Sequence, residues 1–141
     1  MTATREFYSK QTLNPLPVLA DVRIATASAG TLSAYMGRKL AYKSYRNVFG
    51  WAVPTASGIK YYAVHGPYLD DGTTKNPKAG QVNTDVELSG AFVNRLLYNG
   101  ATCVGGALIV GFVRDPAIDY FGVGVITGSL ANVVMTLLNI D

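Results

Sequence analysis

The stretch RKLAYKSYRNVFGW, residues 38–51, carries the most distinctive pattern in the chain and decides the predicted fold. It holds four of the twelve basic residues, interleaved with aromatic residues and uninterrupted by any acidic residue. Because aromatic residues favour strands, we predict a β-strand that covers residues 40–53. Alternate side chains of a strand share a face, which would bring Lys39, Lys43 and Tyr45 together. Such a basic and aromatic face suits an anionic partner.

The next predicted strand, IKYYAVHG at residues 59–66, offers a matching face. It follows the turn VPTASG at residues 53–58, and its Lys60 and Tyr62 point to the same side. If the two strands pair, their lysines would meet phosphates while their tyrosines stack on unpaired bases. An ordinary solvated strand face with extended lysines explains the same pattern, and the residues alone leave both interpretations open.

The distribution of charge supports a phosphate-rich partner. Residues 1–60 hold eight Lys or Arg and two Asp or Glu, whereas residues 61–141 hold four and seven. Positive charge is therefore concentrated in the first half of the chain. Only 15% of the residues are charged, which is low for a globular domain. A chain with few charges can hide much of its surface in a large assembly.

The remaining middle of the chain is predicted to continue the sheet. Residues 18–24 alternate between apolar and polar side chains, which indicates a half-buried strand. Residues 67–85 are rich in Pro, Gly, Asp and Asn and predict a long loop, which is usually functional or an interaction element. Asn99-Gly100 is a hairpin signal, although residues 91–98 also fit two helical turns that end there. We favour strands on both sides, with a buried strand at residues 105–113.

The C-terminal quarter is predicted to be helical. Asp115-Pro116 is a typical helix start, and Gly128-Ser129 predicts a break between two helices. The second helix has an apolar stripe and an uncharged polar stripe, which suits contact with protein more than with water. Residues 120–140 carry no charge, so a membrane span has to be considered. Three glycines, regularly spaced polar residues and the lack of a basic flank argue against it.

No catalytic or metal site is predicted. His65 is the only histidine and Cys103 the only cysteine, so a structural zinc site cannot form within the chain. The glycines after Tyr120 miss the dinucleotide-binding spacing, and the chain has neither a phosphate-binding P-loop nor a nucleophile elbow. We therefore expect a single non-enzymatic domain without a cofactor. The single cysteine indicates a reducing compartment, and MTATREFYSK lacks the features of a signal peptide.

The order of these elements resembles that of the coat proteins of single-stranded RNA bacteriophages. The strand pair before the loop corresponds to LAYKSYRNVFGW and IKYYAVHGPYL, and the loop to DDGTTKNPKAGQVNTD. The strand region that follows corresponds to VELSGAFVNRLLYNGATCVGGALIVGFV, and the helices to DPAIDYFGVGVITG and SLANVVMTLLNID. The resemblance covers most of the chain and is one of pattern.

The resemblance implies an α+β domain over residues 1–141. An antiparallel sheet with an N-terminal hairpin would span residues 5–114, and two α-helices residues 116–140. The subunits would form interlocked homodimers that close into an icosahedral shell, assembled in the host cytoplasm as part of the virion. The sheet would face inward and bind single-stranded genomic RNA and an operator hairpin. Carried over, the RNA-binding residues would be Lys39, Lys43, Tyr45, Lys60 and Tyr62, with Arg95 if residues 91–98 are a strand.

Two alternatives remain open. One is a small β-rich module that binds a ligand or glycan on its aromatic sheet face. The other is a different phage assembly subunit, such as a tail or filament protein. In the coat interpretation we expect neither a membrane nor a small-molecule substrate as a partner, and we leave open whether Cys103 links subunits.

Overall fold

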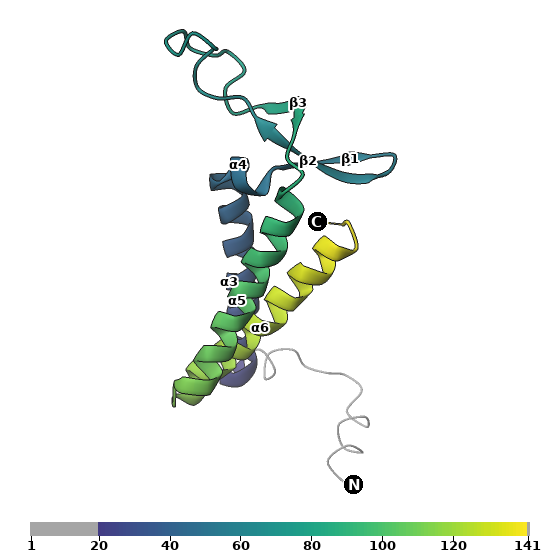
Figure 1. The fold of residues 1–141 in the computed structure, drawn as a ribbon. Helices are drawn as coiled ribbons and strands as arrows, with labels where there is room; N and C mark the ends of the chain where they lie inside the picture. The colour runs from purple at the N-terminus through teal and green to yellow at the C-terminus, as the bar shows by residue number, and fades with distance from the viewer. Residues whose placement is uncertain (1–19, 141) are drawn as a thin grey trace, which may run out of the picture.

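The computed structural model describes residues 20–140 and has an α+β architecture (Figure 1). An N-terminal helical region precedes a three-stranded antiparallel sheet, and two long helices follow it. The α+β class agrees with the sequence prediction. The elements are α3 (Val22–Ser44), α4 (Arg46–Phe49), β1 (Trp51–Thr55), β2 (Gly58–Val64), β3 (Val82–Glu87), α5 (Ala91–Phe112) and α6 (Pro116–Leu137).

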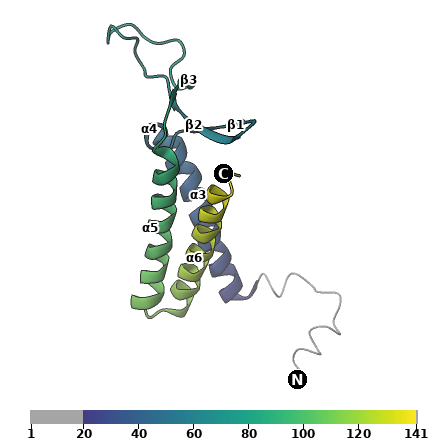
Figure 2. The ribbon, with the colours of Figure 1, turned by 45° about the vertical axis from the view of Figure 1, so that its right-hand side comes forward.

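The three long helices form a bundle, and the sheet lies beyond one end of it (Figures 1 and 2). Helix α6 packs along both α3 and α5. Helix α5 runs away from the sheet, the short connection at residues 113–115 reverses the chain, and α6 returns toward the sheet. We call the sheet, α4 and the long loop the head, and α3, α5 and α6 the bundle.

The largest correction to the sequence prediction is that α3 replaces strands. Helix α3 begins after Asp21, whose side chain accepts a hydrogen bond from the Arg23 N–H, and it continues to Ser44. The strand expected at residues 40–53 is wrong over its first ten residues, and so is the described part of the strand expected at residues 18–24. The N-terminal hairpin expected before it falls largely on residues 1–19, outside the described residues.

The physical reason is a buried stripe with a helical period. The buried residues of α3 are spaced four apart and lie on one helix face: Gly30, Ala34, Arg38 and Tyr42. Packing of this stripe inside the protein outweighs the strand preference of the tyrosines, because intrinsic propensities are weak compared with tertiary contacts.

The sheet is smaller than expected but contains the predicted strand β2. Strand β2 pairs with β1, with Trp51 opposite Tyr62, and the tight turn between them ends at Gly58, whose φ is 120°. The turn predicted at residues 53–58 is therefore confirmed only at residues 56–57, because residues 53–55 belong to β1 and Gly58 begins β2. Strand β3 pairs on the other side of β2, with an irregularity after Tyr62.

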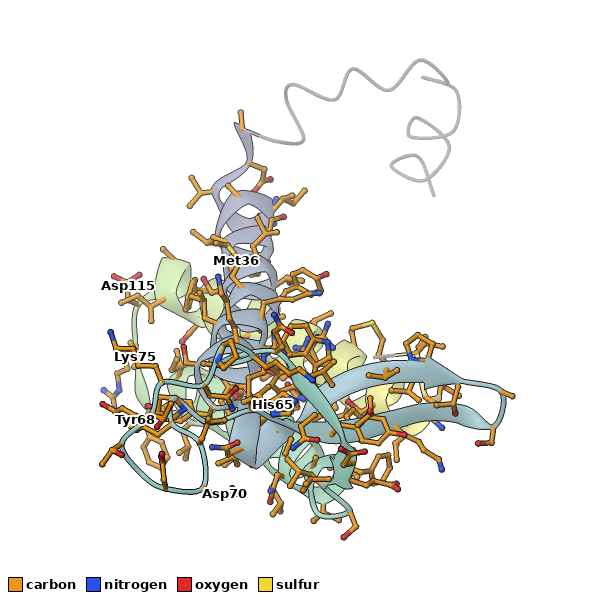
Figure 3. All side chains as sticks on the ribbon, turned by 90° about the horizontal axis from the view of Figure 1, so that it is seen from above. Met36, His65, Tyr68, Asp70, Lys75 and Asp115 are labelled. Carbon is orange, nitrogen blue, oxygen red and sulfur yellow. The ribbon has the colours of Figure 1, made fainter. Side chains whose placement is uncertain are left out.

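The long loop predicted at residues 67–85 is confirmed up to residue 81, and β3 takes its last residues. The loop extends away from the sheet (Figure 1). Seen from the head end in Figure 3, Tyr68 and Lys75 belong to this loop, and an isolated antiparallel bridge joins them. The Asp71 carboxylate accepts hydrogen bonds from the Thr74 hydroxyl and from the Thr74 and Thr73 N–H groups, which together lower the pKa of Asp71.

The strands expected on both sides of Asn99-Gly100 are wrong, because α5 runs through this pair as one continuous helix. The Asn99 side chain is buried and donates to the Tyr42 hydroxyl at 2.7 Å and to the Arg95 carbonyl at 2.9 Å. These bonds hold Asn99 inside a helix instead of in a turn. Gly106 is required by packing, since a Cβ there would lie 2.9 Å from the Gly122 carbonyl oxygen.

Helix α6 begins as predicted and ends differently. Asp115 caps it by accepting hydrogen bonds from the Ala117 and Ile118 N–H groups, and Pro116 occupies its first turn. The break predicted at Gly128-Ser129 is wrong. The glycines instead allow close contact with α3, since a Cβ on Gly124 would lie 1.8 Å from the Ala27 carbonyl oxygen.

Candidate functional site: an inverted bundle and a cationic pocket

The interior of the bundle is polar. The largest side chains that are fully buried are Asn99, Asn132, Thr136 and Ser129. Asn132 donates to the Ala34 carbonyl at 3.5 Å, and the Thr31 hydroxyl donates to the Gly124 carbonyl at 3.1 Å. The uncharged polar stripe predicted for the C-terminal helix therefore does contact protein, but within the same chain.

The threonine hydroxyls of the bundle are bonded within their own helices. Each donates to the carbonyl four residues earlier, over distances from 2.6 to 3.1 Å, and the residues are Thr26, Thr31, Thr102, Thr127 and Thr136. This bonding removes most of the cost of placing a hydroxyl in apolar surroundings.

The outward faces of α5 and α6 are apolar. Phe112 is 81% exposed, and further exposed large residues follow the two helices: Val93, Leu97, Val104, Leu108, Val123, Leu130, Val134 and Leu137. Both helices are long and apolar enough to cross a membrane by length and composition alone. Core helices of soluble proteins can pass the same test, but only 17% of the apolar window of α5 and 39% of that of α6 is buried.

Charged residues occur at the two ends of the bundle and not between them. Residues 24–37, 96–113 and 120–140 contain no Asp, Glu, Lys or Arg, and we call these charge-free segments the apolar belt, although among the described helices only α5 and α6 are apolar enough to cross a membrane. The end far from the sheet carries Asp21, Arg23, Arg114, Asp115 and Asp119. The end near the sheet carries Arg38, Lys39, Lys43 and Arg95, and Arg46 follows α3 in α4 of the head.

Arg95 joins the bundle to the head. Its Nε donates to the Phe49 carbonyl at 2.7 Å and its Nη2 to the Gly50 carbonyl at 2.9 Å. The guanidinium lies between two rings, 4.1 Å from the centroid of Tyr42 and 4.4 Å from that of Tyr61. Arg95 is 2% exposed, so the suggestion that it faces RNA from a strand is corrected: it is a buried connection on a helix.

A small cavity with a positive lining lies where the bundle meets the head. Its volume is about 190 Å³, and its lining residues are Arg38, Lys39, Tyr42, Arg46, Trp51, Ala52 and Arg95. We call it the cationic pocket, because no acidic residue is among these described lining residues. The Arg46 guanidinium stacks on Trp51 at 4.4 Å. Neither Lys39 nor Arg46 has an ion-pair partner within residues 20–140.

The like charges in the pocket act on one another. Burial lowers the pKa of Arg46, and the positive charge of Arg95 lowers it further. Both effects disfavour the charged form of Arg46, and an anion placed between the two guanidinium groups would oppose them.

The residues predicted to bind RNA are not gathered on one sheet face. Lys39 and Lys43 are exposed on α3, and Tyr45 is exposed where α3 ends. Lys43 and Tyr45 line a larger hollow of about 570 Å³ together with Arg46 and Trp51, whereas Lys39 lines the cationic pocket. Lys60 and Tyr62 lie on β2, and Lys60 lines a different hollow beside Glu87.

Sequence reasoning missed the roles of Arg38 and Arg46. Both lie within the basic and aromatic stretch at residues 38–51, and together with Tyr42 they are spaced four residues apart. That spacing is a helical signal and could have identified the lining of the pocket. Within the described part of the chain, no group of three or more His, Cys, Asp or Glu side chains is arranged to hold a metal ion.

No protein-family model, curated protein sequence or solved structure matches the chain. Function is therefore inferred from the polarity of the bundle and from the cationic pocket.

Proposed function

We propose that this chain is a non-catalytic, structural integral membrane protein. Its bundle lies in the bilayer, and its head lies at one membrane surface. The observation that carries this proposal is the inverted polarity of α5 and α6. Their buried side chains include Asn99, Ser129, Asn132 and Thr136, while their outward side chains are large and apolar. In water this arrangement would expose the very groups that folding normally buries.

The contacts between the helices also suit a bilayer. Helices in lipid gain little from burying apolar side chains against one another, so their interfaces use small residues and polar side chains that bond across the interface. Gly124 and Gly128 allow α6 to approach α3, and Gly106 and Gly122 allow it to approach α5. Asn132 and Thr31 supply hydrogen bonds between α3 and α6.

The dimensions of the apolar belt support the same proposal. At about 1.5 Å per residue, the charge-free helical parts of α5 and α6 are each roughly 25 Å long, close to the roughly 30 Å hydrocarbon core of a bilayer. The charge-free part of α3 is shorter, roughly 21 Å. Long side chains such as Lys39 can extend from its end to the headgroup region.

The charges at the two ends predict the orientation. Among the described residues, the sheet end of the bundle carries four basic and no acidic residues, and the far end two basic and three acidic residues. Basic residues beside membrane spans are retained on the cytoplasmic side. The head is therefore assigned to the cytoplasmic surface.

A coat or filament subunit is the second candidate, and a specific feature of α3 favours it. Its outward face includes small and hydroxyl side chains, such as Ser28, Ala29 and Ser33, which fit another helix better than lipid. In that case copies of the chain, not lipid, would cover the apolar belt. Lys39, Lys43, Tyr45, Lys60 and Tyr62 would then stay proposed as RNA contacts.

Membrane fractionation of the expressed full chain separates these functions. A membrane subunit resists alkaline carbonate extraction and floats with vesicles in a density gradient. A coat subunit sediments as uniform particles that contain nucleic acid and need no detergent. A detergent-free soluble monomer would contradict both proposals. The variant Lys75→Glu, in the exposed loop, is the matched control and should fractionate like the parent chain.

A further inference from the structure

We propose that the cationic pocket binds the phosphate group of an anionic phospholipid at the membrane surface. This inference rests on the proposed membrane location and adds to it a specific ligand. The pocket lies where α3, α4 and α5 meet β1, and each of these elements contributes lining residues.

The pocket is preformed by buried side chains. Arg38 is 4% exposed and Arg95 2% exposed, so two of its cations are held within the protein. The Arg38 guanidinium lies 5.2 Å from the Tyr35 ring centroid and 5.6 Å from that of Tyr42. The Arg46 guanidinium rests on Trp51. This stacking fixes the plane of the Arg46 guanidinium, whose in-plane N–H groups match the oxygens of a phosphate.

The charge of the pocket calls for an anion. Arg46 and Arg95 repel each other, and Lys39 adds a third positive charge at the rim. Within residues 20–140, neither Lys39 nor Arg46 has a carboxylate partner. A phosphate oxygen among these groups would form charge-assisted hydrogen bonds and reduce the repulsion.

The position and size of the pocket favour a lipid over a nucleic acid. The apolar belt of α3 ends at Gly37, and the pocket begins with the next residue, Arg38. This is the depth at which phospholipid headgroups lie if the belt occupies the hydrocarbon core. A cavity of about 190 Å³ accommodates a single phosphate group, whereas single-stranded RNA is bound along an extended groove. Lys43, exposed one helical turn beyond Lys39, adds attraction to an anionic surface.

The test uses Trp51, the only tryptophan of the chain, as a reporter inside the pocket. The full chain is purified in an uncharged detergent, and its fluorescence is followed during titration with short-chain phosphatidic acid. Short-chain phosphatidylcholine, inorganic phosphate and a short single-stranded RNA are titrated in parallel. We expect a saturable change in Trp51 emission with phosphatidic acid at concentrations where the other three compounds give none.

Two variants locate the binding. Arg46→Gln should weaken binding of phosphatidic acid about tenfold, because it removes a charge-assisted hydrogen bond. Lys39→Gln, at the rim, should weaken it less. Lys75→Gln, in the loop, should leave it unchanged. Circular dichroism of each variant checks that the helices are intact.

Four outcomes would overturn the proposal. These are no saturable response, an equal response to phosphatidylcholine, saturation by inorganic phosphate alone at the same concentration, and tighter binding of RNA. The last would assign the pocket to a nucleic acid. If the chain floats with vesicles while Trp51 does not respond, the pocket is wrong and the membrane function stands. If the chain is soluble without detergent, the proposed membrane location is wrong. The titration with phosphatidic acid is then repeated in water, and unchanged Trp51 emission there would separately contradict phosphate binding in the pocket.

Discussion

The bundle and the head follow opposite rules of polarity, although they belong to one chain. In the bundle, the side chains of Asn99, Ser129, Asn132 and Thr136 are buried, while Phe112 and most of the leucine and valine side chains of α5 and α6 are exposed. In the head, Phe49 and Tyr61 are buried, and the charged side chains of the loop are exposed. This difference in polarity supports our proposal that the two regions have different surroundings, with lipid around the bundle and water around the head. The boundary between them is the layer that contains Arg95 and the cationic pocket.

The largest effect is expected from filling the contact between α3 and α6. Gly124→Val would place side-chain atoms where a Cβ already lies 1.8 Å from a backbone oxygen of α3. Because neither backbone can move aside cheaply, we expect about 3 kcal/mol or more of destabilisation, seen by circular dichroism during thermal unfolding in detergent. Gly111→Val is the control, since a Cβ there meets no atom within 4 Å. Equal losses in both variants would contradict the packing described for α6.

The next effect distinguishes lipid from water around the bundle. Leu130→Asp places a carboxylate in the middle of the outward face of α6, where Leu130 is exposed. In a bilayer this costs about 3 kcal/mol, so the fraction of the chain that floats with vesicles should fall sharply. In water the same change would be nearly neutral or would improve solubility. Leu69→Asp, at an exposed leucine of the head, should not change flotation.

A smaller effect is expected at the boundary between the regions. Arg95→Met removes the hydrogen bonds to the Phe49 and Gly50 carbonyls and the contacts with two tyrosine rings. We expect about 2 kcal/mol of destabilisation, expressed as faster proteolysis of the head while the helical signal of the bundle persists. Arg114→Met, in the exposed connection between α5 and α6, is the matched control. A bundle that unfolds together with the head would show that Arg95 does more than join them.

The smallest effect is expected in the loop of the head. The pKa of Asp71 is lowered by hydrogen bonds from the Thr74 side chain and from the Thr73 and Thr74 N–H groups. These hydrogen bonds therefore order the loop fully at pH values above the usual aspartate pKa of 3.8. This ordering is lost as the pH falls through the lower pKa that Asp71 has in the folded protein. Asp71→Asn should speed amide hydrogen exchange at Thr73 and Thr74, and Asp70→Asn should not. Equal exchange in both variants would remove this role of Asp71.

Local signals in the sequence predicted the parts of the fold that local chemistry determines. Asp115-Pro116 predicted the start of α6, a short aromatic run predicted β2, and the Pro- and Gly-rich composition predicted the loop. The strands predicted at residues 40–49 and 91–112 are wrong, because the aromatic and β-branched side chains there favour strands while their tertiary contacts require helices. Asn99 illustrates the reason: its bond to Tyr42, 57 positions away, is invisible to a local pattern.

The candidate site was predictable only in part. The concentration of basic and aromatic residues at residues 38–51 identified the right stretch, and Lys39 does line the cationic pocket. Placement on a strand, however, grouped Lys39 with Lys43 and Tyr45 and separated it from Arg38 and Arg46. Arg95 was selected on the assumption of a strand, and the helix turns it into the interior. The sequence alone argues against a membrane span at residues 120–140 because of its glycines and polar residues. In the structure these three glycines and Ser129, Asn132 and Thr136 are buried in the bundle.

The measurement that tests the central claim most directly is a scan of the outward face of α6 with spin labels. In a Cys103→Ser background, single cysteines are introduced at Ile118, Val123, Leu130, Val134 and Leu137, and each label is compared for collision with oxygen and with a water-soluble nickel complex in vesicles. If lipid surrounds the bundle, access to oxygen is highest at Leu130 and falls toward both ends, with the opposite trend for nickel. High nickel access along the whole helix, or protection from both reagents, would contradict a membrane location and would place water or other copies of the chain on this face.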